Sequence, residues 1–318
     1  MLRKRRGEVR KFSFKTNNYG YIFLLPFFIT FLTLQLYPIL YTFYLSFTNL
    51  STANPQGDFI GFGNYIRLFT DKFFLQSIVN TWRIWIFNFI PQLIFAVGLA
   101  ALLTRDKIRG KSLFRGVYFL PNLVTAASVG ILFNVLLGWK DGSINNILVA
   151  LRIIGGDAKI HFLANPVWIS SSVSIILWWM WFGHSMILFM AAMIAVPRDL
   201  YDAAAVDGAN AWHSFWKITL PQIRPITIYV LVTSLIGGLN NFDIPYVMGE
   251  GQNLGVGGPK KSILTMVMHL YNMAFTGGRQ RGYGAAIAFA LFIIVLIFSL
   301  IIFRVMTRGR DTESIRGV

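Results

Sequence analysis

Long apolar runs, separated by shorter polar and basic segments, are the dominant pattern of this chain. A helix needs roughly 20 apolar residues to cross about 30 Å of hydrocarbon. Six segments reach or nearly reach this length, and they predict spans at about 19–48, 84–104, 116–137, 167–196, 225–242 and 282–303. The fifth segment is short and begins at Pro225. The pattern therefore predicts an all-α, polytopic membrane helical bundle with six transmembrane helices.

The composition agrees with this prediction. Of the 318 residues, 55% are hydrophobic and only 13% are charged, whereas about a quarter of a soluble domain is charged. The chain contains no cysteine, which excludes disulfides, thiolate metal sites and a cysteine nucleophile. We expect one transmembrane domain, 19–303, between a basic tail at 1–18 and a second tail at 304–318.

The lysines and arginines predict the orientation of the bundle. Seven lie in the N-terminal tail, five in 105–115, three in 197–224 and four in the C-terminal tail, so 19 of the 29 fall on one face. Short basic segments stay in the cytoplasm, so both termini are expected there. Although the net charge is +16, this placement indicates contact with anionic membrane lipid and no nucleic-acid partner.

The polar segment 197–224, between the fourth and fifth spans, predicts a docking element for a cytoplasmic partner. Asp199 and Asp202 suit a helix N-terminus, and the small side chains of 203–205 let a partner approach the backbone closely. Gly208 can end this short helix in the left-handed region. A second, amphipathic helix is expected after Asn210, with one face formed by Trp212, Phe215, Trp216 and Thr219.

The same segment resembles the signature of bacterial ABC importer permeases, E-A-A, three residues, G, nine residues, I-x-L-P. The matching positions are Asp202, Ala203, Ala204, Gly208, Ile218, Leu220 and Pro221. Spacing agrees throughout, and the one departure is Asp202 where the family usually has Glu. The resemblance implies that these seven residues couple the chain to a separate ATPase subunit through the 199–221 loop.

Further matches resemble the carbohydrate-uptake branch of that family, near the larger maltose-type permease and the glycerol-phosphate permeases. They cover nearly the whole chain and include 37–38, 61–65, 80–81, 142–145, 241–243, 257–259 and 271–275. The resemblance implies a type I ABC importer permease fold in the bacterial cytoplasmic (inner) membrane. It also implies a second homologous permease subunit, a dimer of ATPase subunits that binds ATP and Mg, and an extracytoplasmic solute-binding protein.

Polar residues within the spans are the candidate substrate site, because burying them in lipid is unfavourable unless they are paired or face a cavity. The fifth span carries Thr233, Ser234, Gly237, Gly238, Asn240 and Asn241, followed by Asp243. From the residues alone, sugar binding and helix–helix contact are equally good explanations. Asn240-Asn241-Phe242 matches a run of the maltose permease whose amides contact sugar, which implies substrate contact for both asparagines.

Three more candidates come from the same resemblance. Tyr118 matches a sugar-contacting tyrosine, whereas Asn122 stands where that permease has serine and His184 where it has tyrosine. These two departures point to a different ligand, and glycerol phosphate or a polyol remain alternatives to an oligosaccharide. Three tryptophans of the fourth span could stack on sugar rings or could equally be core or interface aromatics: Trp178, Trp179 and Trp181.

The sequence contains no recognisable catalytic or metal constellation. The four histidines are scattered without ligand spacing, so no metal site is expected. Gly110-Lys111-Ser112 is similar to the end of a P-loop, but Arg105 stands where that loop needs glycine. We therefore expect a non-enzymatic transport subunit that binds no cofactor, with ATP and Mg held by partner ATPase subunits.

Two other functions remain as alternatives. A secondary transporter driven by an ion gradient would place ionisable residues inside its spans, and only Asp243 comes near this description. A membrane-embedded enzyme would need a clustered acid, base or metal set. Co-purification of a soluble ATPase would distinguish the importer from the first alternative, and hydrolase or transferase activity of the pure protein would favour the second.

Overall fold

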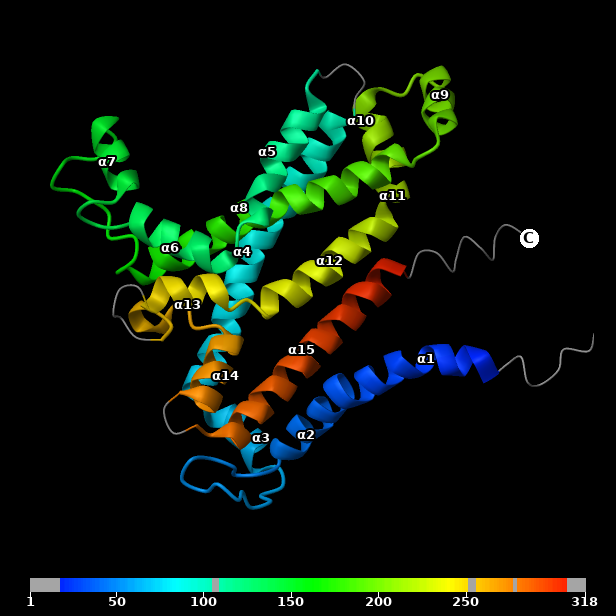
Figure 1. The fold of residues 1–318 in the computed structure, drawn as a ribbon. Coiled ribbons are helices and arrows are strands. Elements are labelled where there is room, and N and C mark those ends of the chain that lie inside the picture. Colours follow the sequence, from blue (N-terminus) through cyan, green and yellow to red (C-terminus); the bar gives the residue numbers. More distant parts are fainter. Residues whose placement is uncertain (1–17, 105–108, 251–255, 277–278, 308–318) are drawn as a thin grey trace, which may run out of the picture.

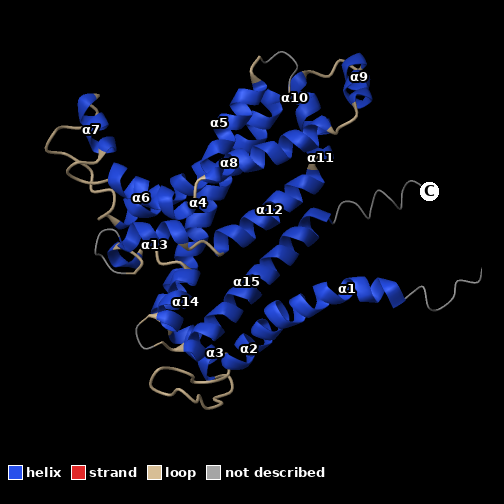
Figure 2. Ribbon diagram, in the orientation of Figure 1, coloured by secondary structure: helices blue, strands red, loops and turns tan. Residues whose placement is uncertain are grey.

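The computed structural model describes residues 18–104, 109–250, 256–276 and 279–307, and within these ranges the chain is built from helices (Figures 1 and 2). The described part has no strand beyond one isolated antiparallel bridge, between Thr48 and Phe59. The long helices are α4 (Lys72–Leu103), α8 (Pro166–Ile194), α12 (Arg224–Leu239) and α15 (Arg281–Thr307). An N-terminal helical stretch consists of α1 (Asn18–Phe31), a π-helical turn (Leu32–Leu36) and α2 (Tyr37–Leu45). The shorter helices are α3 (Gly63–Thr70), α5 (Lys111–Leu123), α6 (Ala126–Leu136), α7 (Ser143–Ala150), α13 (Asp243–Glu250) and α14 (Met266–Phe275).

Five stretches of the described chain are long and apolar enough to cross a membrane, and a bent pair gives a sixth if it counts as one span. The five are Phe23–Leu45, Lys72–Leu103, Pro166–Ile194, Arg224–Glu250 and Arg281–Thr307. The expected all-helical bundle is therefore confirmed. The second helix begins twelve residues before the predicted span, because Asp71 caps it at Lys72.

The third predicted span, 116–137, is not one straight helix. Helices α5 and α6 meet at an angle of 92°. Pro121 lies in the last turn of α5, Val124 is extended, and the Thr125 hydroxyl caps the first turn of α6. A continuous helix is interrupted here because proline lacks the N–H that the preceding turn needs and Thr125 supplies a new N-terminus.

Helices α4 and α8 pack together at the centre of the bundle, and α5 packs against α8. At Gly183 of α8 the approach is so close that a methyl group would overlap the Tyr118 carbonyl of α5. By contrast, the apolar side chains of α1 and α2 are mostly exposed, and this stretch runs along the outside of the bundle (Figure 1). These exposed side chains suit a surface in contact with lipid.

Buried asparagines connect the helices to loops that are distant in the sequence. Asn64 of α3 donates to the carbonyls of Ser46 and Thr48, at 2.9 and 2.8 Å. Asn80 of α4 donates to the Lys261 and Leu264 carbonyls, at 2.7 and 3.2 Å. Asn145 of α7 donates to the Ile160 carbonyl at 2.9 Å. These asparagines fall in segments 61–65, 80–81 and 142–145, so these motif residues have a structural role.

The segment 262–275 is rich in apolar residues. Its helical part is α14, which packs against α4 and α15. Met266, Met268 and Ala274 are buried in these contacts. The segment therefore covers the bundle.

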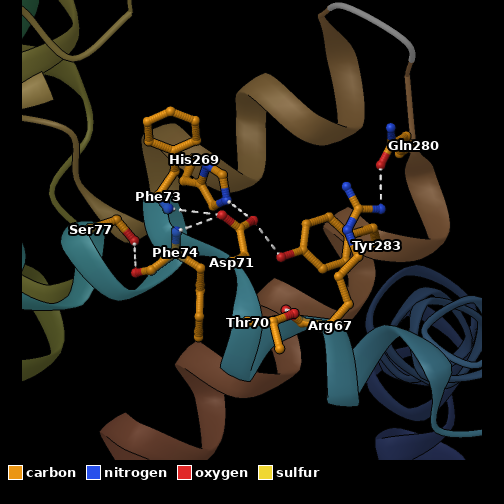
Figure 3. A network of polar contacts seen from close by, with 9 residues as sticks. All are labelled: Arg67, Thr70, Asp71, Phe73, Phe74, Ser77, His269, Gln280 and Tyr283. Atoms are coloured by element: carbon orange, nitrogen blue, oxygen red, sulfur yellow. Dashed lines mark hydrogen bonds and ion pairs between the residues drawn. The ribbon is translucent and has the colours of Figure 1, made fainter.

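One carboxylate joins four helices at the end of the bundle that carries α3 and α14 (Figure 3). Asp71 accepts hydrogen bonds from the Phe73 and Phe74 N–H groups of α4, at 2.8 and 3.2 Å. Its Oδ2 also accepts from the Tyr283 hydroxyl of α15 at 2.6 Å and lies 3.1 Å from Nε2 of His269 on α14. Arg67 of α3 lies over the Tyr283 ring, 4.0 Å from its centroid.

Burial and hydrogen bonding act in opposite directions on the two ionisable groups of this network. Partial burial by itself raises the pKa of Asp71, but the bonds from Tyr283, the Phe74 N–H and His269 together hold it below its usual value. Burial lowers the pKa of His269, and together with the nearby charges of Lys261 and Arg67 it outweighs the opposite effect of Asp71. We therefore describe the 3.1 Å contact as a hydrogen bond from a neutral imidazole to a carboxylate.

Candidate functional site

The segment 197–224 forms a short helix, a glycine break and a second helical stretch. Helix α9 (Arg198–Val206) is followed by Gly208 at φ +78°, in the left-handed region. The Ala209 N–H donates to the Ala204 carbonyl at 2.8 Å, which closes the last turn of α9. Asp202, Ala203 and Gly208 are exposed, and α9 lies at one end of the molecule (Figure 1).

The second half of the segment differs from the expected amphipathic helix. It consists of α10 (Ala211–Ser214), a π-helical turn (Phe215–Thr219) and α11 (Leu220–Gln222). The expected common face divides, because Thr219 is buried and Phe215 half-buried while Trp212 and Trp216 are 70% and 49% exposed. The wider π turn inserts one residue and so changes the phase of the side chains.

The base of α9 is attached to the bundle through the predicted motif. The Tyr201 hydroxyl of α9 hydrogen-bonds the Thr219 hydroxyl at 2.8 Å. Ile218 and Leu220 are half-buried against an apolar cluster that contains Ile223 and residues of α4 and α8. Pro221 is exposed. The motif thus combines an exposed short helix with two half-buried apolar residues that pack against the bundle.

A cavity of about 260 Å³ lies between α4, α8 and the junction of α12 with α13. Four of the six predicted substrate residues line it: His184, Ser234, Asn240 and Asn241. Thr233, Gly237, Gly238 and Asp243 of the fifth span and Trp181 of α8 also line it. The structure therefore brings most of the expected polar residues to one place.

The other two predicted residues lie elsewhere. Tyr118 lines a separate, largely apolar cavity of about 390 Å³, together with Trp178 and Trp179. Its ring packs against Phe182 with the centroids 5.7 Å apart. Asn122 is half-buried and is not among the residues that line either cavity. The bend between α5 and α6 falls directly after these positions.

Helix α12 ends where the two asparagines stand. Asn240 caps α12, and its side chain donates to the Ile236 carbonyl at 2.8 Å. Asn241 lies in the break before α13, and its buried Nδ2 has no hydrogen-bond partner among the described residues. The two amides therefore differ, because Asn240 is bonded to its own helix whereas Asn241 is available to a ligand.

Three residues of the cavity were missed by the sequence analysis: Asn88, Gln92 and Ser185. All three are buried, and the Gln92 side-chain amide donates to the Ser185 hydroxyl at 2.8 Å. A signal was present, because Asn88 and Gln92 are polar residues four positions apart inside the span predicted at 84–104. The argument applied to the fifth span, that polar residues inside a span are candidate site residues, also identifies these two.

The cavity is lined by amides, hydroxyls and aromatic or aliphatic groups, with few charges. Among the described residues that line it, His184 and Asp243 are the ionisable ones, and none is lysine or arginine. A search of the described ranges finds no group of three residues that could hold a metal ion. Amides and hydroxyls can both donate and accept hydrogen bonds, so this lining suits a neutral, hydroxyl-rich ligand.

A different environment occurs beside α9. A second polar cavity, of about 650 Å³, lies between α9, α10 and the adjoining ends of α4, α5 and α8. Lys111, Arg115 and Arg198 are the charged side chains that line it. The two cavities therefore differ in character: the basic cavity lies beside the exposed helix α9, whereas the neutral cavity lies between α4, α8 and the α12–α13 junction.

Comparison with known proteins identifies relatives over almost the whole chain. The family model described as "Binding-protein-dependent transport system inner membrane component" matches residues 14–308. The lactose transport system permease protein of Rhizobium radiobacter is 33% identical, over 89% of this chain and 92% of its own. The arabinooligosaccharides transport system permease protein of Bacillus subtilis (strain 168) is 32% identical, over 88% and 86%. The trehalose/maltose transport system permease protein of Thermococcus litoralis is 29% identical, over 95% and 98%.

Solved structures share the fold. A chain of a bacterial ABC transporter involved in the import of the acidic polysaccharide alginate matches with a TM-score of 0.73 at 23% identity, covering 92% of this chain and 96% of that one. The alginate transporter in complex with its pentasaccharide-bound periplasmic protein matches with the same TM-score at 21% identity, over 93% and 96%. The fold class predicted from the sequence is confirmed by these matches.

Proposed function

Because the chain belongs to the family of binding-protein-dependent transport system inner membrane components, we propose that it is a permease subunit of an ATP-driven importer of carbohydrates. It is a multi-pass protein of the bacterial inner membrane. Several relatives are named for di- or oligosaccharide transport, which supports an oligosaccharide as substrate. The single observation that carries the proposal is the match over 14–308, joined to a polar cavity inside the bundle.

The proposed importer contains four further components. A second homologous permease subunit completes the translocation pathway, and two ATPase subunits bind ATP and Mg. An extracytoplasmic binding protein delivers the sugar, and this is supported by the solved alginate transporter with its periplasmic protein. This chain contributes the pathway and the coupling segment, while ATP hydrolysis takes place on the partner ATPase.

Coupling in this proposal runs through α9. The exposed Asp202 and Ala203 of α9, together with Gly208 in the turn that follows it, form the surface that the ATPase holds. Movement of α9 reaches the bundle through the Tyr201–Thr219 hydrogen bond and through the half-buried Ile218 and Leu220. A short, capped helix attached at its base moves as one body, so closure of the ATPase dimer tilts the adjoining helices.

The cavity supports a neutral sugar over an acidic one. The described residues of its lining include the carboxylate of Asp243 but no lysine or arginine, which would pair with a uronate. The solved transporter that shares the fold is involved in the import of alginate, an acidic polysaccharide. We propose that this chain differs from it in transporting a neutral sugar. Amides and hydroxyls of Asn241, Thr233 and Ser234 are suited to sugar hydroxyls.

The test uses the complete transporter in proteoliposomes, with Gly208→Asp as the variant. Gly208 lies at φ +78° with no atom within 4 Å of a Cβ, and Gly110 lies at φ +79° with the same open space. Gly110→Asp therefore introduces the same backbone strain and the same charge outside α9. We expect Gly208→Asp to insert normally but to lose uptake and transport-linked ATP hydrolysis, while Gly110→Asp keeps both.

Two results would contradict the proposed function. Full transport by a well-expressed Gly208→Asp protein would remove the coupling role of α9. Uptake driven by an ion gradient in vesicles that contain no ATPase subunit would instead favour a secondary transporter.

A further inference from the structure

Among the described residues, four asparagines are at least nine-tenths buried, and Asn88 differs from the other three. Asn64, Asn80 and Asn145 each donate to backbone carbonyls of distant segments. Asn88 is 5% exposed, and its Oδ1 is buried with no partner among the described residues. Buried polar atoms in proteins are almost always bonded, so an unbonded amide calls for a ligand or a water molecule.

The position of Asn88 on α4 is held from both sides. Trp85, one turn earlier, donates from Nε1 to the Ser234 carbonyl of α12 at 3.0 Å. Gln92, one turn later, donates to the Ser185 hydroxyl of α8 at 2.8 Å. Residues three and four apart share a helix face, so Asn88 lies between two anchored neighbours on the face that lines the 260 Å³ cavity.

A second unbonded amide lines the same cavity. Nδ2 of Asn241, at the break after α12, is buried without a partner in the described part of the chain. The cavity thus has an orphan acceptor from α4 and an orphan donor from the α12–α13 junction. A sugar hydroxyl is a suitable partner for either atom, because it donates one hydrogen bond and accepts others.

We propose that Asn88 binds a hydroxyl of the transported sugar, so that the substrate lies between α4 and the α12–α13 junction. This inference rests on the proposed function and adds α4 to its binding site. The unpaired side-chain atoms of Asn88 and Asn241 would gain hydrogen-bond partners only when substrate is present. Without substrate these buried atoms stay unpaired, which lowers the stability of the protein. Gln92 and Ser185 are joined by a hydrogen bond, which fixes the positions of α4 and α8 beside the cavity.

The first arm of the test is stability, with Asn88→Leu and Asn80→Leu compared in the purified protein. Leucine has nearly the shape of asparagine but no polar atoms. Asn80 bonds two carbonyls and accepts from Arg83, so its replacement leaves several groups unpaired and lowers the melting temperature. Asn88→Leu removes an unsatisfied group, so its melting temperature stays at or above that of the wild type.

The second arm is uptake by the complete transporter with its ATPase and binding protein. The probes are lactose, trehalose, maltose, arabinooligosaccharide and diacetylchitobiose, the sugars in the names of the relatives. For whichever probe the wild type transports, Asn88→Leu should raise the half-saturating concentration or lower the rate by roughly tenfold, which corresponds to one lost hydrogen bond. Asn88→Ser, which keeps a donor and acceptor, should recover part of this loss.

The outcomes separate the two claims. If Asn88→Leu melts as early as Asn80→Leu, Asn88 has a structural partner and the inference is wrong. If Asn88→Leu is stable and transports like the wild type, the inference is wrong while the proposed function stands. If the wild type transports none of the five sugars, sugars of these kinds are not its substrates, and the role of Asn88 in binding them fails too.

Discussion

The contact between α4 and α12 gives the sharpest stability prediction, because two adjacent glycines should respond in opposite directions. A Cβ built on Gly238 overlaps Cδ1 of Trp85 and lies 2.8 Å from Nε1, where ordinary contact begins at 3.4 Å. The Trp85 ring cannot move away freely, because it stacks on Phe89 and donates to the Ser234 carbonyl. At Gly237 a Cβ meets no atom within 4 Å.

These contacts set the expected magnitudes. Overpacking at Gly238→Ala costs about 1–3 kcal/mol, and displacement of Trp85 from the Ser234 carbonyl costs about 1 kcal/mol more. Gly237→Ala changes only the backbone entropy and helix propensity, so it stabilises by about 0.5–1 kcal/mol. We expect Gly238→Ala to lower the melting temperature of the purified protein by roughly 4–8 °C and Gly237→Ala to raise it slightly.

A double-mutant cycle tests the cause. Trp85→Leu makes room for the added methyl group, so Gly238→Ala should be much less harmful in that background than in the wild type. Equal melting temperatures for Gly237→Ala and Gly238→Ala would refute the reasoning, because Trp85 would then not be held against α12. If the effects of Trp85→Leu and Gly238→Ala on stability are simply additive, the destabilisation by Gly238→Ala does not arise from its contact with Trp85.

Three further predictions concern stability, each checked by thermal unfolding. The free energy of unfolding should fall as the pH drops below about 6.5, because the pKa of His269 is lowered in the folded state and the unfolded state then binds more protons. It should fall again below about pH 4, because the pKa of Asp71 is also lowered in the folded state. Tyr283→Phe should cost about 1.5–3 kcal/mol, since it removes a 2.6 Å bond to a carboxylate. Gly183→Ala should cost at least about 1–3 kcal/mol, because its methyl group meets the Tyr118 carbonyl. A melting temperature that does not change with pH would contradict the first prediction, and wild-type stability of Tyr283→Phe or Gly183→Ala would contradict the second or the third.

The apolar helices and the short helix with its glycine break at 198–208 could be predicted because their signals are local. Lipid requires each crossing helix to be apolar along its own length, so the runs are visible without knowledge of any neighbour. The break at Gly208 is equally local, because few other residues adopt φ near +78° without strain. The π turn at 215–219 was not predicted, since its signal is weaker than that of a helix start or end.

The candidate site could be predicted only in part. His184, Ser234, Asn240 and Asn241 share a cavity, but Tyr118 lines a different one. Helices α5 and α6, which together correspond to the predicted third span, meet at 92° and so run in different directions. No pattern along the chain specifies that angle, because it depends on packing against α8 and α13.

Asn80 and Asn88 show what the sequence determined by itself and what required the tertiary structure. Both are asparagines of α4, about two turns apart, and the sequence alone shows that each is a polar residue within or beside an apolar run. The fold places the carbonyls of Lys261 and Leu264 opposite Asn80 and a cavity opposite Asn88. A buried amide stabilises the fold or awaits a ligand according to whether a partner faces it, and the tertiary structure alone decides which groups face each other.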